Sequence, residues 1–219
     1  MRIKRSVSLL LAALLALTLA GCGVGKSKNA AMSIHPAQLT EEEERMAQLL
    51  DTSLDSYRIF DFQMGGGQKD GAQTVQIAIY ELTDGDWKPL FQGREAFLDS
   101  TGRIALSFGK LTEGVDMAVQ SEGGYVTRSF TVEAKDDVSI TAYLTSVLSE
   151  TASMEYDKEV PLVVQIATAK SEIFSSDVNG FYTPEQYEKH GYEHVYAITV
   201  MFSQKTPAEL AREGQKGDP

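Results

Sequence analysis

Val160-Pro-Leu-Val-Val-Gln-Ile-Ala167 and His194-Val-Tyr-Ala-Ile-Thr-Val-Met-Phe202 are the two stretches that decide the fold. Apolar residues occupy nearly every position of both, so neither face of either segment is suited to contact with water. Short apolar runs that are rich in β-branched and aromatic residues are typical of strands buried on both faces. We therefore expect these stretches to form two central strands of one sheet.

Other segments alternate between apolar and polar residues, as half-buried strands do. They cover residues 57–64, 75–80, 87–91, 103–109, 115–120 and 125–132. Asp84-Gly85 and Glu122-Gly123-Gly124 mark turns between them, because these residues tolerate positive φ. Short strands separated by glycine turns at intervals of about ten residues indicate a sandwich or barrel. The sequence predicts a mainly β fold, an antiparallel β-sandwich of about eight to nine strands.

One amphipathic α-helix is expected to precede the sandwich. Thr40 and Glu43 have the spacing of a capping box, and the four glutamates of residues 41–44 would complement the helix dipole in the first turn. An apolar stripe at helical spacing follows, formed by Met46, Leu49, Leu50 and Leu54. A short helix is also expected after Thr183-Pro184, because proline favours the first position of a helix.

Residues 138–154 fit two patterns. Val138, Ile140 and Ala142 alternate as in a strand, whereas Leu144, Val147 and Leu148 also fit a helix over residues 141–154. We expect a strand over residues 138–144, followed by a loop rich in serine and threonine.

The first 22 residues have the features of an export signal. A basic start over residues 1–5 precedes an apolar run over residues 7–20, which is too short for a comfortable membrane span. The run ends in Leu19-Ala20-Gly21-Cys22, which closely resembles the lipobox of bacterial lipoproteins. In that family the signal is cut before the cysteine, and the cysteine carries the lipid. The resemblance implies lipidation of Cys22 and a location at the cell membrane, facing outside the cytoplasm.

These features divide the chain into four parts. We expect a signal peptide over residues 1–21, a flexible tether over 22–38, a single sandwich domain with its N-terminal helix over 39–206, and a tail over 207–219. The tether is small, polar and glycine-containing, which is typical of flexible linkers. Cys22 is the only cysteine, so no disulfide is expected.

The chain is acidic, with a formal net charge of −11. Removing the signal peptide removes three basic residues and no acidic ones, which makes the charge −14. Nucleic-acid binding needs a concentrated basic surface. The charge therefore argues against nucleic acid as a partner.

Aromatic residues concentrate near the second central strand. The candidate binding residues are Trp87, Phe181, Tyr182, Tyr187 and Tyr192. Rings with polar tips are common on surfaces that bind sugars or proteins, but they also pack on cores. On the first interpretation the protein is a non-catalytic binding module for a cell-envelope component, either a glycan or a protein. On the second, the rings cap the end of the sandwich.

His190-Gly-Tyr-Glu-His194 resembles the H-x-x-E-H pattern of the inverzincin metalloproteases. That family holds both histidines on one helix, whereas here Gly191 interrupts a helix and the residues after His194 alternate as a strand. A looser zinc site at His190 and His194, or calcium at the turn aspartates, is the remaining metal hypothesis. No cofactor is otherwise predicted. The alternative function is a metal-dependent or carboxylate-based hydrolase that acts outside the cytoplasm.

Overall fold

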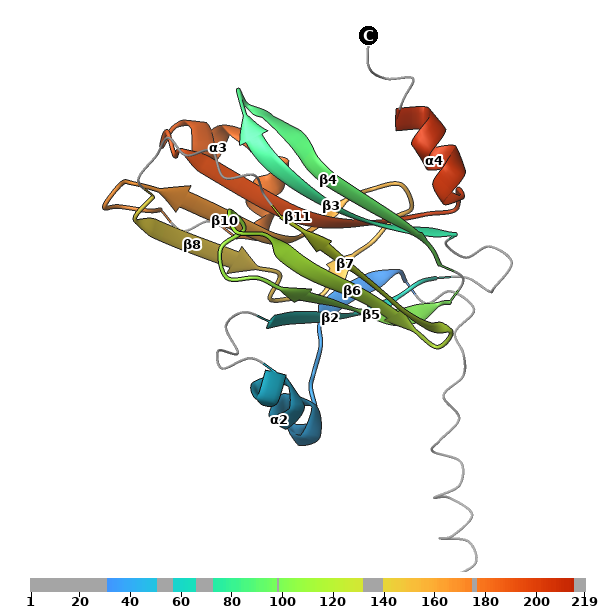
Figure 1. The fold of residues 1–219 in the computed structure, drawn as a ribbon. Coiled ribbons are helices and arrows are strands. Elements are labelled where there is room, and N and C mark those ends of the chain that lie inside the picture. The colour runs from blue at the N-terminus through green and yellow to red at the C-terminus, as the bar shows by residue number, and fades with distance from the viewer. Residues whose placement is uncertain are drawn as a thin grey trace, which may run out of the picture.

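The computed structural model describes residues 31–50, 57–65, 73–97, 99–131, 140–174 and 177–214 of the chain. These residues form two antiparallel β-sheets that pack against each other (Figure 1). The buried apolar side chains of both sheets belong to one core. The predicted fold class, a mainly β antiparallel sandwich, is confirmed.

One sheet contains β1 (Ser33–Pro36), β2 (Tyr57–Gln63), β5 (Thr101–Ser107), β6 (Val115–Ser121), β7 (Gly124–Phe130) and β9 (Ala152–Ser153). The other contains β3 (Thr74–Thr83), β4 (Asp86–Ala96), β8 (Ala142–Val147), β10 (Val160–Thr168) and β11 (His194–Ser203). The strand orders are β7-β6-β5-β2-β1-β9 and β4-β3-β11-β10-β8. The two strands that the sequence patterns did not predict are β1 and β9, which are too short to show an alternation.

Strands β10 and β11 lie in the interior of the five-stranded sheet, as predicted. β11 pairs with β10 on one side and with β3 on the other, and all nine residues of β10 are buried. Successive side chains of a strand point to opposite faces of its sheet. Both faces of this sheet therefore need an apolar cover.

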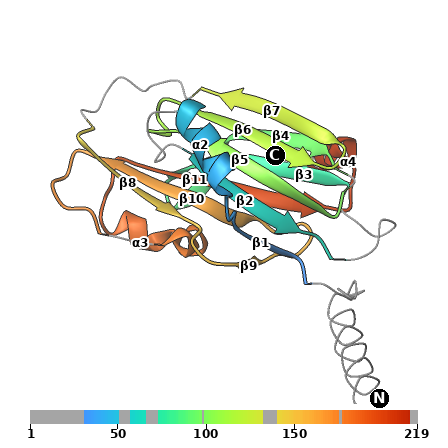
Figure 2. The same ribbon diagram turned by 90° about the horizontal axis from the view of Figure 1, so that it is seen from below.

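The six-stranded sheet covers the inner face, where Phe60, Ile104 and Leu106 are fully buried. The outer face is covered by the short helices η2 (Val178–Tyr182) and α3 (Glu185–Glu188), of which η2 contacts β10. Figures 1 and 2 show α3 on the side of β10 and β11 that faces away from the other sheet. The aromatic segment around residue 181 is thus part of the packing of the sandwich.

The ambiguous segment is a strand and not a helix. β8 runs over Ala142–Val147 and pairs with β10 from Thr168↔Ala142 to Val163↔Val147. The expected strand began at Val138, but residues 138–139 lie outside the described part of the chain. The strand continues three residues past the expected end at Leu144, because Thr145, Ser146 and Val147 also pair with β10.

Two helices begin with capping boxes. In α2 (Glu41–Leu50), the backbone N–H of Thr40 donates to Glu43 at 2.8 Å, and the N–H of Glu43 donates to the Thr40 hydroxyl at 3.2 Å. Thr206 and Glu209 repeat this arrangement at the start of α4 (Pro207–Gly214), which occupies the predicted tail. The predicted apolar stripe of α2, formed by Met46, Leu49, Leu50 and Leu54, lies outside the described side chains.

The predicted tether is wrong over residues 33–36, which form β1. This strand pairs with both β2 and β9, and Ile34 is fully buried opposite Phe62. Next to it, the N–H of Met154 donates to the carbonyl of Met32 at 2.9 Å. A single buried isoleucine in a polar segment gives no periodicity, so the sequence did not reveal this strand.

The signal peptide and Cys22 lie outside the described residues. Within the described residues, no helix is long and apolar enough to cross a membrane.

Ile34→Ala should lower the free energy of unfolding by about 2–5 kcal/mol, because it removes buried methyl groups from the core. The measurement is urea denaturation followed by circular dichroism. His35→Ala is the matched control, because His35 lies on the opposite face of the same strand, and its effect should be much smaller. Equal stability of the Ile34 variant and the wild type would show that β1 is not part of the domain.

Candidate functional site

The structure divides the predicted aromatic residues between two clusters. In the first cluster, Trp87 stacks on Phe181 with ring centroids 5.1 Å apart, and the Trp87 Nε1–H donates to the Phe181 carbonyl at 2.8 Å. Tyr182 and Tyr187 contact these two rings edge-on. Tyr192 belongs to the second cluster. The region is therefore not one continuous recognition surface.

Tyr187 is a core residue, and its prediction as a binding residue is wrong. Its side chain is only 2% exposed, and its hydroxyl packs so closely on Gly180 that a Cβ atom there would have no room. Trp87 and Phe181 are partly buried and also pack against the core. These three rings pack on the core, as the second interpretation predicted, but they cover the outer face of the five-stranded sheet and not the end of the sandwich.

Tyr182 is the one ring of this cluster that faces solvent, with 57% of its surface exposed. Its hydroxyl donates to the carbonyl of Glu159 at 3.0 Å. The Tyr182 ring borders a hollow with an empty volume of about 880 Å³, which we call the Glu159 hollow. Its lining residues are Ser153, Glu155, Lys158, Glu159, Val160, Phe181 and Tyr182.

Of the two glutamates that line this hollow, Glu159 is the partly buried one. The Tyr80 hydroxyl, from β3, donates to Glu159 Oε1 at 2.5 Å. Burial raises the pKa of the Glu159 carboxyl, and the hydrogen bond from Tyr80 opposes that rise. Burial also raises the pKa of Tyr80, so this residue keeps its proton and remains a donor.

Further polar groups surround Glu159 on the covered face of the sheet. Gln76 accepts a hydrogen bond from Arg94 Nε at 2.6 Å and also stabilises the Glu159 carboxylate by hydrogen bonding. The Thr199 hydroxyl is close enough to add to this stabilisation, yet it makes no hydrogen bond of normal geometry within the described structure, and Thr199 is only 1% exposed.

The second cluster is a column of three stacked rings. Phe174 stacks on His190 at 4.4 Å, and His190 stacks on Tyr192 at 5.5 Å, measured between ring centroids. The N–H of Phe174 donates to the Tyr192 hydroxyl at 2.9 Å, and Lys170 Nζ donates to the His190 carbonyl. These contacts fix the loop that precedes β11, so Tyr192 and His190 have a structural role here.

His194 makes a different set of contacts from His190. Its Nδ1 lies 2.7 Å from Glu81 Oε1, and both side chains are largely buried. Glu193, the acid of the H-x-x-E-H pattern, accepts hydrogen bonds from Thr168 and from the backbone of Ala169. The pattern does not lie on a helix, because α3 ends at Glu188 and Gly191 has a φ of +56°.

No group of three or more His, Cys, Asp or Glu side chains that could hold a metal ion occurs in the part of the chain that the structure describes. Zinc binding at His190 and His194 therefore gains no third ligand from these residues. Of the turn aspartates considered for calcium, Asp84 and Asp86 lie at the β3–β4 turn, and Asp136 and Asp137 lie outside the described residues.

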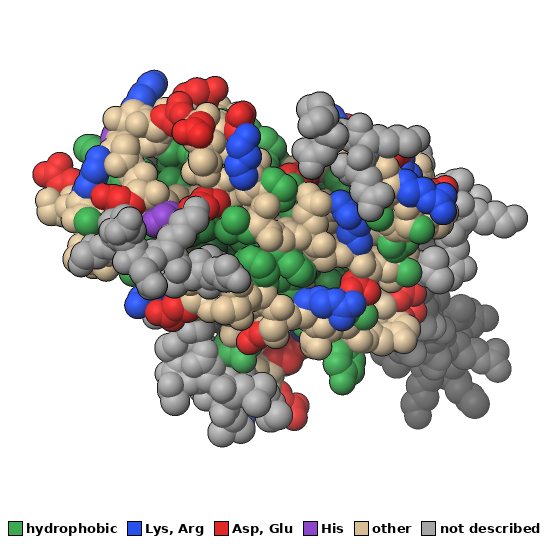
Figure 3. All heavy atoms as spheres, turned by 45° about the horizontal axis from the view of Figure 1, so that its top comes forward, with side chains coloured by type: hydrophobic (Ala, Val, Ile, Leu, Met, Phe, Trp, Pro, Cys, Tyr) green, Lys and Arg blue, Asp and Glu red, His purple; other side chains and the backbone are tan. Residues whose placement is uncertain are grey.

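Comparisons of this chain with family models, with curated proteins and with solved structures found no match. The functional argument therefore depends on the geometry of the site. On the face of the molecule in Figure 3, the described lysine and arginine side chains lie scattered among acidic and polar ones. A scattered arrangement is unlike the concentrated basic surface that phosphate backbones need.

Tyr187→Ala should lower the free energy of unfolding by about 3–5 kcal/mol, because it empties a buried aromatic site. Tyr182→Ala should change it by less than about 1 kcal/mol, because most of that ring is exposed. Urea denaturation of both variants measures the difference. A small loss in Tyr187→Ala would show that this ring does not support the outer cover of the sheet.

Proposed function

We propose that this protein is a non-catalytic module that binds a glycan of the cell envelope at the Glu159 hollow. One observation carries the proposal: the exposed Tyr182 ring borders the same hollow as the half-buried carboxyl group of Glu159. Ligand sites typically combine apolar or aromatic walls with a few well-positioned polar groups.

A sugar ring matches this combination of groups. Its C–H face can pack on the ring of Tyr182 or Phe181, which offers a large rigid surface at little entropic cost. Its hydroxyls can donate to Glu159 and accept from the Lys158 ammonium at the rim of the hollow. Because Tyr80 and Gln76 already orient the carboxyl group, the ligand would not have to order it.

A hydrolase acting on glycans would need a second catalytic carboxylate facing the first across the sugar. Glu155 is the other acid that lines the hollow, and it forms an ion pair with Lys158 at 2.7 Å. That pairing favours binding over catalysis as the role of this hollow. A protein partner is the other ligand class that an exposed aromatic ring suits, and it is one outcome of the test below.

We also propose that the mature protein is anchored to the membrane through a lipid on Cys22 and faces outside the cytoplasm. The support is the lipobox-like sequence at residues 19–22. Because β1 begins at Ser33, only residues 23–32 separate the lipid from the first strand. Ten residues span at most about 35 Å, so the domain would remain close to the membrane surface.

Glycan binding can be tested by a thermal-shift screen of cell-wall and other glycans, with zinc and calcium included. A glycan at about 100 times its dissociation constant should stabilise the fold by about 2.7 kcal/mol. Tyr182→Ala and Glu159→Gln should each weaken that binding at least about tenfold, as loss of a central contact does. Phe174→Ala is the control, because this exposed ring lies in the second cluster, and it should bind normally.

Three results would contradict the proposal or redirect it. If no glycan raises the melting temperature, protein recognition becomes the better hypothesis, and cross-linking on intact cells would test it. Release of shorter saccharides would indicate a hydrolase. A zinc response that is lost in His190→Ala or His194→Ala would support the metal hypothesis.

Cys22→Ala should abolish lipidation and leave the precursor uncleaved. The expected result is a protein that keeps the mass of residues 1–21 and lacks the mass of the lipid, as measured by mass spectrometry of the intact protein. Ser27→Ala is the matched control within the same segment and should behave as the wild type. A wild-type protein without the added mass of a lipid, or a Cys22 variant that is cleaved like the wild type, would remove the argument for a lipid anchor.

A further inference from the structure

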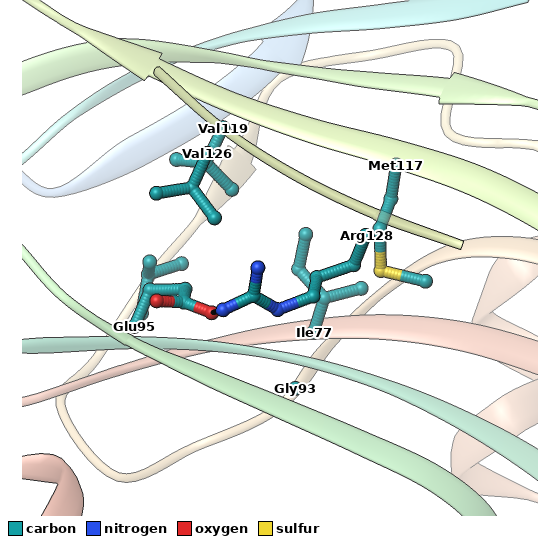
Figure 4. Close-up of a pocket in the computed structure, with 8 residues that line it drawn as sticks. Ile77, Gly93, Glu95, Met117, Val119, Val126 and Arg128 are labelled. Carbon is teal, nitrogen blue, oxygen red and sulfur yellow. Dashed lines mark ion pairs between the residues drawn. The ribbon is translucent and has the colours of Figure 1, made fainter. Parts of the chain in front are cut away.

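One side of the sandwich is open between β4 and β7, which are edge strands of the two sheets. Each pairs with a single strand of the described structure, β4 with β3 and β7 with β6. Figure 4 shows a slot between them, lined by aliphatic side chains from both sheets. Its lining residues are Val75, Ile77, Gly93, Glu95, Met117, Val119, Val126 and Arg128.

Two charged side chains point into this slot from opposite sheets. Arg128 of β7 and Glu95 of β4 form an ion pair across the open side, drawn as the dashed line in Figure 4. Beyond this pair, the rings of Phe91 and Phe130 meet with centroids 5.2 Å apart. The slot is therefore closed in that direction by two contacts between the edge strands.

In the other direction the slot opens into a groove with an empty volume of about 690 Å³. The groove shares Val75, Glu95, Val119 and Val126 with the slot, so the apolar floor is continuous. The charged residues that line the groove are Glu95 and Asp99, and Tyr125, which is 77% exposed, lies at its rim. The slot itself has an empty volume of only about 270 Å³, so the room for a ligand lies mainly in the groove. We call the slot and the groove together the channel, which has an apolar floor, one blind end and an acidic mouth.

We propose that this open side binds an aliphatic chain that carries a cationic head group, such as a long-chain amine. The chain would occupy the apolar floor, where aliphatic walls on both sides exclude water. The head group would lie at the mouth, attracted by the two carboxylates and by the face of the Tyr125 ring. Since Glu95 is already paired with Arg128, Asp99 is the carboxylate of the mouth that forms no ion pair with a described residue. It accepts a hydrogen bond from the Gly123 N–H at 3.2 Å.

An inward-pointing ion pair also protects edge strands from pairing with other chains. That role accounts for Glu95 and Arg128, but it does not account for the apolar groove beyond them or for the exposed Tyr125. The proposal is independent of the Glu159 hollow, which lies between the β9–β10 loop and η2 and shares no lining residue with this channel.

The test compares three probes with the same chain and different heads: octylammonium, 1-octanol and octanoate. Each is titrated into the full protein, and methyl NMR shifts of Val75, Val119 and Val126 are followed. Octylammonium should give saturable shifts, with 1-octanol weaker and octanoate weakest. Asp99→Asn should weaken octylammonium binding by about two- to fivefold, the usual range for an exposed charge pair, and should leave 1-octanol unchanged.

Val126→Trp should fill the channel and abolish the shifts at Val75 and Val119. Thr127→Trp is the matched control, because the next residue of β7 points away from the channel, and it should bind normally. The proposal is overturned if no probe gives saturable shifts, if octanoate binds as tightly as octylammonium, or if Val126→Trp binds like the wild type. Asp99→Asn lies outside the packed slot, so it tests the charge even if the tryptophan variant folds poorly.

Discussion

The structure depends on one constraint, which is that the five-stranded sheet is apolar on both faces. Strands β10 and β11 bury side chains in both directions, and apolar surface of this extent is stable only when it is removed from water. The six-stranded sheet covers one face. A second cover is needed for the other face, and the chain supplies it in the connection between β10 and β11, whose Phe181 and Tyr187 pack with Trp87 of β4.

The candidate binding site lies where that second cover ends. Phe181 packs against the sheet, whereas the neighbouring Tyr182 already faces solvent. At this border the outer face of the sheet changes from apolar to polar, with Tyr80, Gln76 and Thr199 around the carboxyl group of Glu159. Polar groups that are covered on one side and open on the other keep fixed positions and remain accessible, which is the arrangement that selective binding requires.

The open edges of the sandwich carry a risk of aggregation, because the unpaired backbone groups of an edge strand can pair with a strand of another molecule. β4 carries Pro89, and its pairing with β3 shifts register at Leu90; both features weaken pairing at an edge. β7 lacks proline and depends on Arg128, which turns inward to Glu95. The ion pair protects this edge, and the apolar groove of the proposed ligand site lies next to it, with Glu95 lining both.

The sequence by itself determined the fold class, the central position of β10 and β11, and the capped start of α2, because period-two alternation, doubly apolar runs and capping boxes are local patterns. Only the tertiary structure decided which aromatic residues are core and which are surface. Tyr182 and Tyr187 look alike in sequence, but one faces solvent and the other lies under η2. The environment of Glu159 was also decided by the tertiary structure, because its hydrogen-bond donor Tyr80 lies 79 residues away in the sequence. Ile34 is buried only because β2 and β9 lie beside it. Burial depends on what distant segments place around a residue, and no local pattern records that.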